Sequence, residues 1–422
     1  MTAEIRDAKA LIVGASVAGV RVARDLRRLG FDGLIVMTSA EEVLPYDKPP
    51  LSKQYLAGAF DASRVSLLDA TEVDDLRIEL RLGSRATELH ASEKIVVDAS
   101  GAEFPYDVCV VATGASARPS PWGGDKRVHL LRTMADSDRL RSGLAESTKV
   151  GVVGGGLIGS EVAGTAAKGG AEVTVIDPLA SPMSRLVGDD VAHDFLKAHH
   201  RHGVTTRFGV GVEALTEDDS GVDVVLSDGS HLRFDLVVVG IGATTNDGWL
   251  AGSGIETGQG IECDRFGRVT GLDGVYAAGD VARWPRPPFG EPRRVEHWTN
   301  AVEQAATVAA NILRPADPVG YDPVDYVWSD QHDLKLQLVG WPEHSKLYCV
   351  VGQRDRMPPR YAALYADGRG VLSGAATVNW PRGLAECRRL VAERVPVSAA
   401  KDRLEALATP ATTTSANTTP AS

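Results

Sequence analysis

Two segments of this chain repeat one pattern, and the repeat limits the folds that the chain can adopt. The first, KALIVGASVAGVRVARDLRRLG, begins at Lys9, and the second, KVGVVGGGLIGSEVAGTAAKGG, begins at Lys149. Each has an apolar run, a cluster of glycines and a helical stretch that ends in glycine, and a second apolar run follows. This order predicts a βαβ unit. Because 140 residues separate Gly14 from Gly154, the two units predict two nucleotide-binding domains and not a solenoid.

The composition excludes several other classes of protein. The 422 residues are 43% apolar and 24% charged, which is typical of a globular protein with two or three domains. The formal charge of −11 argues against nucleic-acid binding. The N-terminal residues do not resemble a signal peptide, and no apolar stretch is long enough to span a bilayer. We therefore expect a cytoplasmic protein without nucleic-acid or membrane partners.

The remaining segments complete a discontinuous domain layout. A hairpin and a buried strand are expected between the two βαβ units, and a further strand and a long helix follow Gly274. After Tyr326, alternating apolar residues predict antiparallel strands and a closing helix, which indicate a small α+β domain. The uncharged C-terminal end is expected to be a disordered tail. The expected domains are residues 1–117 with 246–325, residues 118–245 and residues 326–405, and the tail is 406–422.

The second unit has the stronger nucleotide motif. Its glycines allow a tight turn, a close approach to a pyrophosphate and close packing of helix on strand, and the helix N-terminus offers free N–H groups. Asp177 ends the next strand, 18 residues past Gly159. An acid there binds an adenosine ribose and repels a 2′-phosphate, which favours NADH over NADPH. A solvated turn is the alternative for Asp177, and the nearby Arg185 complicates the choice. The predicted NAD contacts are Gly154, Gly156, Ile158, Gly159, Glu161, Asp177 and Arg185.

The first unit departs from the motif at one position. It has Gly14, Ser16 and Gly19, so serine replaces the middle glycine. The serine adds a Cβ where a pyrophosphate would pass, but its hydroxyl can bond a phosphate oxygen. Glu41, 22 residues past Gly19, is the expected ribose acid, with Glu42 as a rival and a solvated loop acid as the alternative for either.

Longer motifs carry a resemblance to a known family. ATG at Ala112–Gly114 and YAAGD at Tyr276–Asp280 are similar to the two-dinucleotide flavoproteins, whose fold is glutathione-reductase-like. LPYDKPPLSKQYLAG, GGGLIGSEVA, RVEHWTNAVEQA and WSDQHDLKLQLVG resemble the FAD-dependent NADH:ferredoxin reductases of Rieske oxygenase and bacterial cytochrome P450 systems. The likeness runs from about Lys9 to about Val395. It implies two Rossmann-like α/β domains that hold FAD and NADH, and a smaller C-terminal α+β domain.

The same resemblance implies roles for individual residues. Lys53 matches a lysine beside the flavin N5 and Glu161 its ion-pair partner, whereas Asp280 matches the acid that bonds the ribityl chain. Trp298 and Trp328 match aromatic residues near the flavin ring. The catalytic set is thus Lys53, Glu161 and Trp328, and the FAD contacts are Gly14, Ser16, Gly19, Glu41, Lys53, Thr113, Gly114, Arg118, Gly279, Asp280 and Trp298. Without these motifs, the same lysine and glutamate would be interpreted as surface charges and the tryptophans as core residues.

The route by which electrons leave the protein is open to several interpretations. A disulfide or peroxide reductase needs a cysteine beside the flavin, yet no cysteine precedes Cys109, which falls in a predicted buried strand. The interpretation we favour is transfer of single electrons to an acidic [2Fe–2S] ferredoxin. A loop rich in arginine is expected to dock it, and a solvated loop is the alternative. This loop contains Arg283, Arg286, Arg293 and Arg294 against Glu291, and a second basic set is Arg382, Arg388 and Arg389.

Two other functions fit the same fold. One is an NADH oxidase or quinone reductase, which would turn over without a protein acceptor. The other is a non-catalytic NADH-binding module, because a fold by itself does not fix a function.

Overall fold

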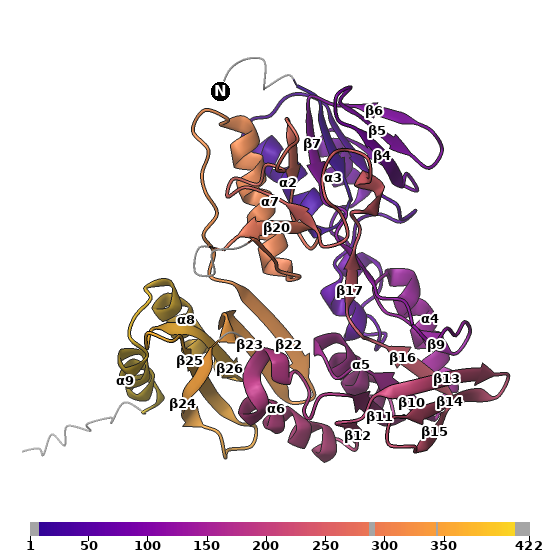
Figure 1. The fold of residues 1–422 in the computed structure, drawn as a ribbon, viewed down its shortest axis with the longest axis vertical. Coiled ribbons are helices and arrows are strands. Elements are labelled where there is room, and N and C mark those ends of the chain that lie inside the picture. Colours follow the sequence, from indigo (N-terminus) through magenta and orange to yellow (C-terminus); the bar gives the residue numbers. More distant parts are fainter. Residues whose placement is uncertain (1–7, 287–291, 343–344, 410–422) are drawn as a thin grey trace, which may run out of the picture. The chain divides into compact units, whose positions relative to one another are not determined.

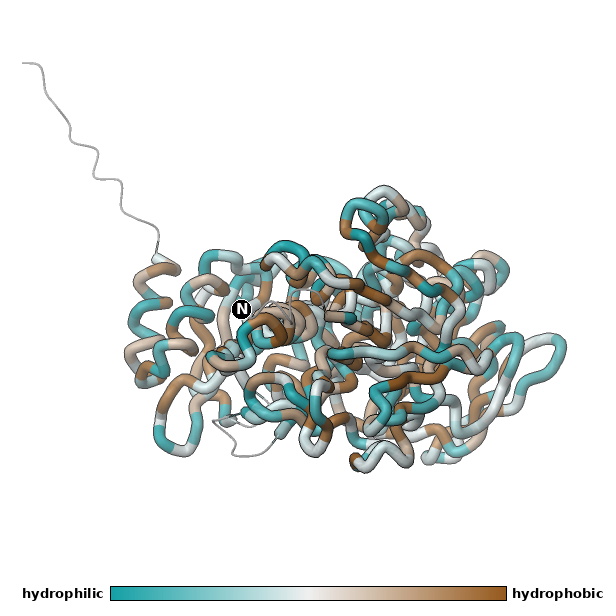
Figure 2. The backbone as a smooth tube through the Cα atoms, turned by 90° about the horizontal axis from the view of Figure 1, so that it is seen from above, coloured by the Kyte–Doolittle hydropathy of each residue, from teal (hydrophilic) through white to brown (hydrophobic). Residues whose placement is uncertain are grey.

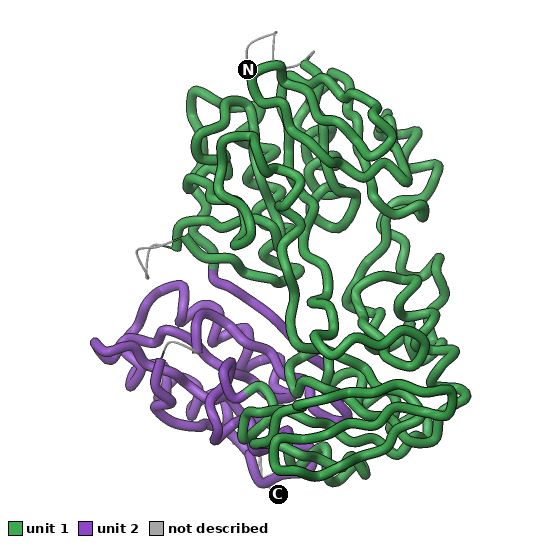
Figure 3. Tube along the Cα trace, turned by 45° about the vertical axis from the view of Figure 1, so that its right-hand side comes forward, with its two compact units in different colours: residues 1–183, 196–323 green, residues 184–195, 324–422 purple. Residues whose placement is uncertain are grey.

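The computed structural model describes residues 8–286, 292–342 and 345–409. The chain forms two compact units (Figure 3). Unit 1 contains residues 1–183 and 196–323, and unit 2 contains residues 184–195 and 324–422.

The FAD half of unit 1 is built on a five-stranded parallel sheet with the order β19-β7-β1-β2-β3 (Figure 1). Strands β1 and β2 are buried at every position, which explains their almost wholly apolar sequences. Helices α2 (Val17–Arg28) and α7 (Trp298–Leu313) pack against each other beside it. The five strands are β1 (Ala10–Val13), β2 (Ile35–Thr38), β3 (Ile78–Arg81), β7 (Val108–Val111) and β19 (Val275–Ala277).

The FAD half also contains several short helices and strands. The expected hairpin is present as an antiparallel sheet, and the segment expected to be an arginine-rich loop is partly a strand pair. The elements are η1 (Pro49–Ser52), η2 (Ser63–Val65), α3 (Ala70–Asp75), β4 (Ala86–His90), β5 (Ile95–Asp98), β6 (Glu103–Pro105), η3 (Gly248–Leu250), β18 (Ile261–Glu262), β20 (Ala282–Pro285) and β21 (Pro292–Arg294).

The NAD half of unit 1 has a second parallel sheet with the order β12-β11-β10-β16-β9. A three-stranded antiparallel sheet, β13-β14-β15, belongs to the same half. The run HLRFDLVVV is therefore two strands in different sheets, separated at Asp235. The elements are β9 (Val128–His129), α4 (Met134–Glu146), β10 (Lys149–Val153), α5 (Leu157–Lys168), β11 (Glu172–Asp177), α6 (Ser184–Arg201), β12 (Thr205–Phe208), β13 (Val212–Asp218), β14 (Gly221–Leu226), β15 (His231–Phe234) and β16 (Leu236–Val239). Strands β8 (Ala115–Ala117) and β17 (Ala243–Thr245) pair where the chain passes between the halves.

Unit 2 has the antiparallel sheet that the C-terminal sequence predicts, in the order β22-β23-β26-β25-β24. Two helices follow it, and the second, α9, continues to Ala408. Residues 406–408, expected in the tail, are therefore helical, because Leu404 and Ala400 of the same helix are buried in the core of this unit. The elements are β22 (Tyr326–Gln331), β23 (Leu334–Gly340), β24 (Lys346–Gln353), β25 (Arg360–Ala366), β26 (Leu372–Val378), α8 (Pro381–Ala392) and α9 (Val397–Ala408). The rest of the expected tail, from residue 410, lies outside the described residues.

Residues 184–195 of α6 also belong to unit 2, although the sequence assigns them to the NAD-binding domain. Arg354 donates to the carboxylates of Asp190 and Asp194 at 2.8 Å each, and the Tyr361 hydroxyl donates to Asp194 at 2.6 Å. These bonds fasten the segment to the C-terminal sheet. These bonds could not be predicted from the sequence, because the partners are more than 150 positions apart.

Hydrophilic and hydrophobic stretches are interspersed along the coloured part of the tube in Figure 2. Among the described residues, none of the helices combines the length and the apolar character needed to cross a membrane.

Candidate active site

Both glycine turns have the geometry that their motifs predict. Gly14 and Gly154 have φ values of +115° and +109°, which favour glycine, and a Cβ at either would lie 2.3 Å from a carbonyl oxygen. A Cβ at Gly19 or Gly159 would lie 1.9 Å from the carbonyl oxygen of the first glycine in its own turn. These glycines are therefore required by close packing of strand, turn and helix.

The middle position of the second turn is different, because it faces open space. A Cβ at Gly156 would meet nothing within 4 Å. Gly156 and Ser16 are the N-cap residues of α5 and α2, and neither helix start has a side-chain cap. The free N–H groups of both helix starts are thus left for an anion, and the Ser16 hydroxyl makes no capping bond that would compete with one.

Asp177 lies at the end of β11 and braces the second turn. Its carboxylate accepts from the backbone N–H of Gly155 at 2.7 Å and of Leu179 at 2.8 Å. It is half-buried beside the turn, where a ribose-binding acid belongs. Ile158 is 46% exposed on the first turn of α5. Arg185 is exposed on the segment that belongs to unit 2, and its contact with a nucleotide remains a prediction.

Lys53 and Glu161, 108 positions apart, form a buried ion pair. Lys53 follows η1 in the FAD half, and Glu161 lies on α5, the helix that begins at the second glycine turn. The Lys53 ammonium is 2.7 Å from Glu161 Oε2, and the two side chains are 13% and 6% exposed. The Ser52 hydroxyl donates to the same oxygen at 2.5 Å. The pairing implied by the family resemblance is thus present.

Asp280 has a partner that the sequence did not reveal. It follows Gly279 at the carboxyl end of β19, and its carboxylate accepts from Arg132 at 2.7 Å. Lys48 contributes a second cation, which pairs with Glu41 at 3.3 Å. Burial lowers the pKa of Lys48, and the Glu41 charge opposes that shift. Arg132 was missed because a single cation in a loop carries no motif, whereas Lys48 lies within the motif LPYDKPPLSKQYLAG but was given no role.

Glu41 is part of a small hydrogen-bond network. The Tyr46 hydroxyl donates to Glu41 at 2.6 Å and accepts from the backbone N–H of Met134 at 2.9 Å. Burial, helped by the bond to Glu41, raises the pKa of the Tyr46 hydroxyl. Glu41 is therefore held in place from the NAD half as well as from its own loop.

The remaining predicted FAD residues surround the same region. Gly279 has a φ of +81°, and the Thr113 hydroxyl donates to the Asn246 carbonyl at 2.7 Å. The Trp298 indole donates to Asp47 at 2.8 Å, which fixes the plane of the ring. A Cβ at Gly114, whose φ is +67°, would meet only Arg132 within 4 Å. Arg118 is exposed, so nothing here fixes its side chain against a cofactor.

The arginine-rich segment needs one correction. Arg286 is 2% exposed, donates to Asn300 at 2.6 Å and lies over the Tyr321 ring. A buried guanidinium cannot meet a partner protein, so the docking role expected for Arg286 is wrong. Arg283, Arg293 and Arg294 are half-buried on the β20–β21 pair. Glu291 lies outside the described residues.

Trp328 belongs to unit 2, where its ring stacks on Tyr326 with centroids 5.9 Å apart. Its predicted position near a flavin ring concerns the other unit and remains a prediction. Arg388, in the second basic set, lies over the Tyr326 ring at 5.1 Å from its centroid.

The cysteines are poorly placed for thiol chemistry. Cys109, Cys263 and Cys387 are buried, and Cys349 is half-buried. Burial raises the pKa of all four thiols, that of Cys387 to about 12. They therefore remain protonated at neutral pH, which makes them weak nucleophiles.

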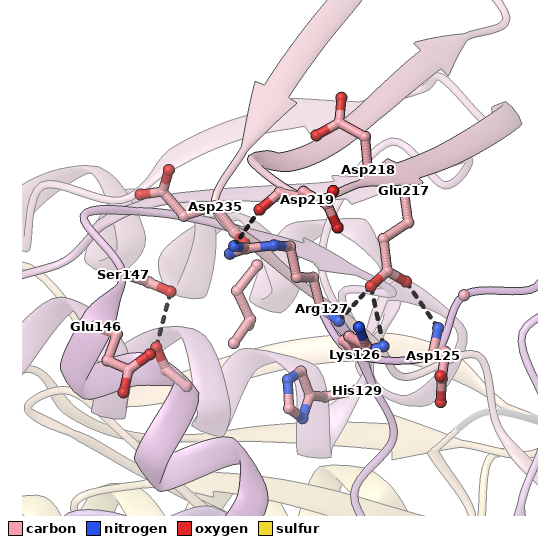
Figure 4. A pocket seen from close by; sticks show the side chains of 13 residues that line it. Asp125, Lys126, Arg127, His129, Glu146, Ser147, Glu217, Asp218, Asp219 and Asp235 are labelled. Atoms are coloured by element: carbon pink, nitrogen blue, oxygen red, sulfur yellow. Dashed lines mark hydrogen bonds between the residues drawn. The ribbon is translucent and has the colours of Figure 1, made fainter.

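A pocket in the NAD half lies away from all these residues (Figure 4). The Glu217 carboxylate accepts from three consecutive backbone N–H groups, those of residues 125–127. Ser147 and Asp235 also line the pocket; Ser147 lies two residues before β10, and Asp235 directly precedes β16. The pocket is therefore at the amino edge of the parallel sheet, whereas nucleotides bind at the carboxyl edge.

The site residues fit two dinucleotides. Each turn offers free N–H groups at a helix start and an acid near the end of the following strand, and the middle position of the second turn faces open space. The fold and these two sites define a two-nucleotide flavoprotein reductase. The comparison with family models agrees: residues 8–305 match the pyridine nucleotide-disulphide oxidoreductase model, and the chain belongs to that family. Residues 326–410 match a reductase C-terminal domain.

Particular relatives narrow the class. The chain is 37% identical to the 5,5'-dehydrodivanillate O-demethylase ferredoxin reductase subunit of Sphingobium sp., over 95% of this chain and 96% of that one. It is 32% identical to putidaredoxin reductase CamA of Pseudomonas putida, over 92% of each chain. The putidaredoxin reductase–putidaredoxin complex matches with a TM-score of 0.87 at 29% identity, over 95% of this chain and 99% of that one. The family expected from the sequence is thus confirmed, and with it an oxidoreductase that uses FAD and NADH.

Proposed function

We propose that this chain is the NADH-dependent reductase of a [2Fe–2S] ferredoxin that supplies an oxygenase or a cytochrome P450. The observation that carries the proposal is the buried Lys53–Glu161 pair, because it joins the half with the first glycine turn to the half with the second. The Sphingobium relative supports the class of acceptor, since its name describes a ferredoxin reductase subunit.

FAD supplies the redox chemistry, because it takes two electrons as a hydride and gives them up one at a time. The side chains would bind and orient the cofactors and place charges beside them. The first glycine turn and Ser16 would hold the FAD diphosphate, Glu41 the adenosine ribose, and Asp280 a ribityl hydroxyl. Glu161 and Ser52 hold the Lys53 ammonium in one position, where its charge would stabilise negative charge on the ring.

The second glycine turn would hold the NADH diphosphate, and Asp177 the adenosine ribose. Its carboxylate accepts from two N–H groups and retains lone pairs for ribose hydroxyls. Trp328 would shield the ring face. The expected domain layout, with residues 1–117 and 246–325 for FAD and residues 118–245 for NAD, belongs to the same proposal.

We place the ferredoxin on the β20–β21 pair. Arg283 and Arg294 are directly opposite each other on these strands, and like charges in that arrangement destabilise a strand pair. Arg294 forms an ion pair with Glu296. An acidic partner would offset the repulsion, which fits a docking surface formed by Arg283, Arg293 and Arg294.

The test is an anaerobic NADH titration followed by addition of ferredoxin. Reversal of Arg293 and Arg294 to Glu should slow ferredoxin reduction about tenfold or more at low salt and leave the reduction of the flavin by NADH nearly unchanged. The same charge change at two other exposed arginines, Arg28 and Arg77, is the control, and it should leave both rates intact.

Two results would contradict the proposal. Full ferredoxin turnover in the double reversal would move the docking site elsewhere, with the Arg382, Arg388 and Arg389 set as the next choice. If every [2Fe–2S] ferredoxin is reduced more slowly than oxygen or a quinone, the chain is an oxidase or quinone reductase.

A further inference from the structure

A buried amide lies directly behind the predicted FAD site. Gln304 is on α7 and is 0% exposed. Its Oε1 accepts from the backbone N–H of Gly279 at 2.8 Å. Gly279 precedes Asp280, the predicted ribityl acid, so Gln304 is bonded to the backbone of the predicted cofactor site.

The other end of this amide is unsatisfied. In the part of the chain that the structure describes, Gln304 Nε2 has no hydrogen-bond partner, and it is shielded from solvent. The orientation of the amide is not arbitrary, because the Gly279 N–H can donate only to the oxygen. A buried NH₂ group without an acceptor destabilises the folded protein, and native proteins leave few such groups.

The surroundings indicate which acceptor is missing. A Cβ at Gly279 would lie 3.3 Å from the Cβ of Ala18 on α2 and 3.6 Å from that of Ala301 on α7. The amide therefore lies where the start of α2, the start of α7 and the Gly279 backbone converge. Helix α2 starts at the first glycine turn, and the free N–H groups there can bind an anion.

We infer that Gln304 is an FAD-binding residue: Nε2 donates, directly or through one bound water molecule, to the diphosphate–ribityl part of the cofactor. The inference rests on the proposed function only in taking FAD as the occupant of the first site. Gln304 would then link cofactor binding to the position of Gly279 and Asp280.

The residue Asn311 provides a matched control. It is also a fully buried amide on α7, but the protein satisfies it at both ends. Its Nδ2 donates to Phe266 and Val319 carbonyls at 2.9 Å each, and its Oδ1 accepts from the Val319 N–H at 2.7 Å. Asn311→Asp therefore introduces the same chemical change in a buried site that is not predicted to meet the cofactor.

The experiment measures FAD release on dilution of the purified flavoprotein, together with its thermal unfolding, from pH 6 to pH 9. Gln304→Glu keeps the acceptor for Gly279. As a carboxylate it would oppose the negative diphosphate, so the FAD affinity should fall at least tenfold as pH rises. In Asn311→Asp the unfolding temperature should fall as pH rises, while the FAD affinity should stay equal to that of the parent protein. Gln304→Met, which removes the donor without adding charge, should weaken FAD about tenfold at every pH.

The outcomes separate the possible failures. If the Gln304 variants bind FAD as tightly as Asn311→Asp at every pH, Gln304 is only a structural pin and the inference is overturned. If Gln304→Glu does not fold, the result for Gln304→Met decides. If the parent protein is purified without FAD and does not take it up, the proposed function itself fails.

Discussion

Removal of either member of the Lys53–Glu161 pair should be costly. At 2.7 Å the Coulomb attraction is roughly 6 kcal/mol for an effective dielectric constant of about 20. Desolvation offsets much of it, and breaking a buried pair from one side costs about 3–5 kcal/mol, because the other charge stays behind. We expect a loss in this range for Lys53→Met and for Glu161→Gln. The double variant should be less destabilised than the sum by about 1–3 kcal/mol.

Two assays on the same variants separate stability from chemistry. Urea unfolding of the purified flavoprotein gives the free energies, and anaerobic stopped-flow mixing with NADH gives the rate of flavin reduction. Loss of a fixed charge at the reacting edge should slow that rate about 100-fold in Lys53→Met. The control is Glu72→Gln, which breaks a partly exposed pair with Arg24 and should cost no more than about 1 kcal/mol.

The reasoning fails under either of two results. A coupling energy below about 0.5 kcal/mol would mean that the two charges act independently. A flavin reduction rate in Lys53→Met within twofold of the parent would mean that the ammonium is not at the reacting edge of the ring.

Three further changes test other parts of the site. Asp280→Ala should weaken FAD binding about 10- to 150-fold, since a hydrogen bond to a charged acceptor contributes about 1.5–3 kcal/mol; equal FAD retention on gel filtration would reject this role. Asp177→Ser should narrow the preference for NADH over NADPH in kcat/KM, and equal use of both by the parent would contradict the assignment. Burial lowers the pKa of His297, against the raising effect of the Asp280 charge. Because the unfolded chain keeps the ordinary pKa of histidine, it takes up a proton at a higher pH than the folded protein does. Stability should therefore fall as pH drops below about 6.5, and His297→Gln should flatten that decline in unfolding temperature.

Features set by neighbouring residues could be predicted from the sequence. Gly19 and Gly159 are local examples, because each is required by the carbonyl of the first glycine in its own turn. The antiparallel C-terminal sheet was also predictable from alternation along each strand. The contact between Lys53 and Glu161 was expected only because the motifs that contain them resemble a family.

Features set by distant residues could not be predicted. Arg132 is 148 positions from Asp280 and stands in a segment without a motif. Arg286 was expected to be exposed because arginine usually is. In the structure, Asn300 accepts its hydrogen bond and the Tyr321 ring covers its guanidinium, and these partners come from an adjacent helix and from the loop that follows it. Long-range burial of this kind leaves no periodic signal.

The ion pairs and hydrogen bonds of unit 1 have a common arrangement, which bears on how hydride transfer is set up. Lys53–Glu161 and Asp280–Arg132 each join the FAD half to the NAD half. The loop that carries Lys53 makes further bonds of the same kind. The Ser137 hydroxyl donates to the Leu51 carbonyl at 2.9 Å, and the Thr165 hydroxyl donates to the Ser52 carbonyl at 2.9 Å.

Hydride transfer requires the reacting atoms to approach within about 3–3.5 Å. Two nucleotides held on separate turns meet that requirement only if the halves that carry the turns are fixed to each other. The two ion pairs and the two hydroxyl–carbonyl bonds fix the halves to each other close to the Lys53 ammonium. The NAD half, through α4 and α5, therefore positions the charge that would act on the FAD ring. A change at Ser137 of α4 or Thr165 of α5, neither of which is a predicted cofactor contact, should therefore affect the rate of flavin reduction.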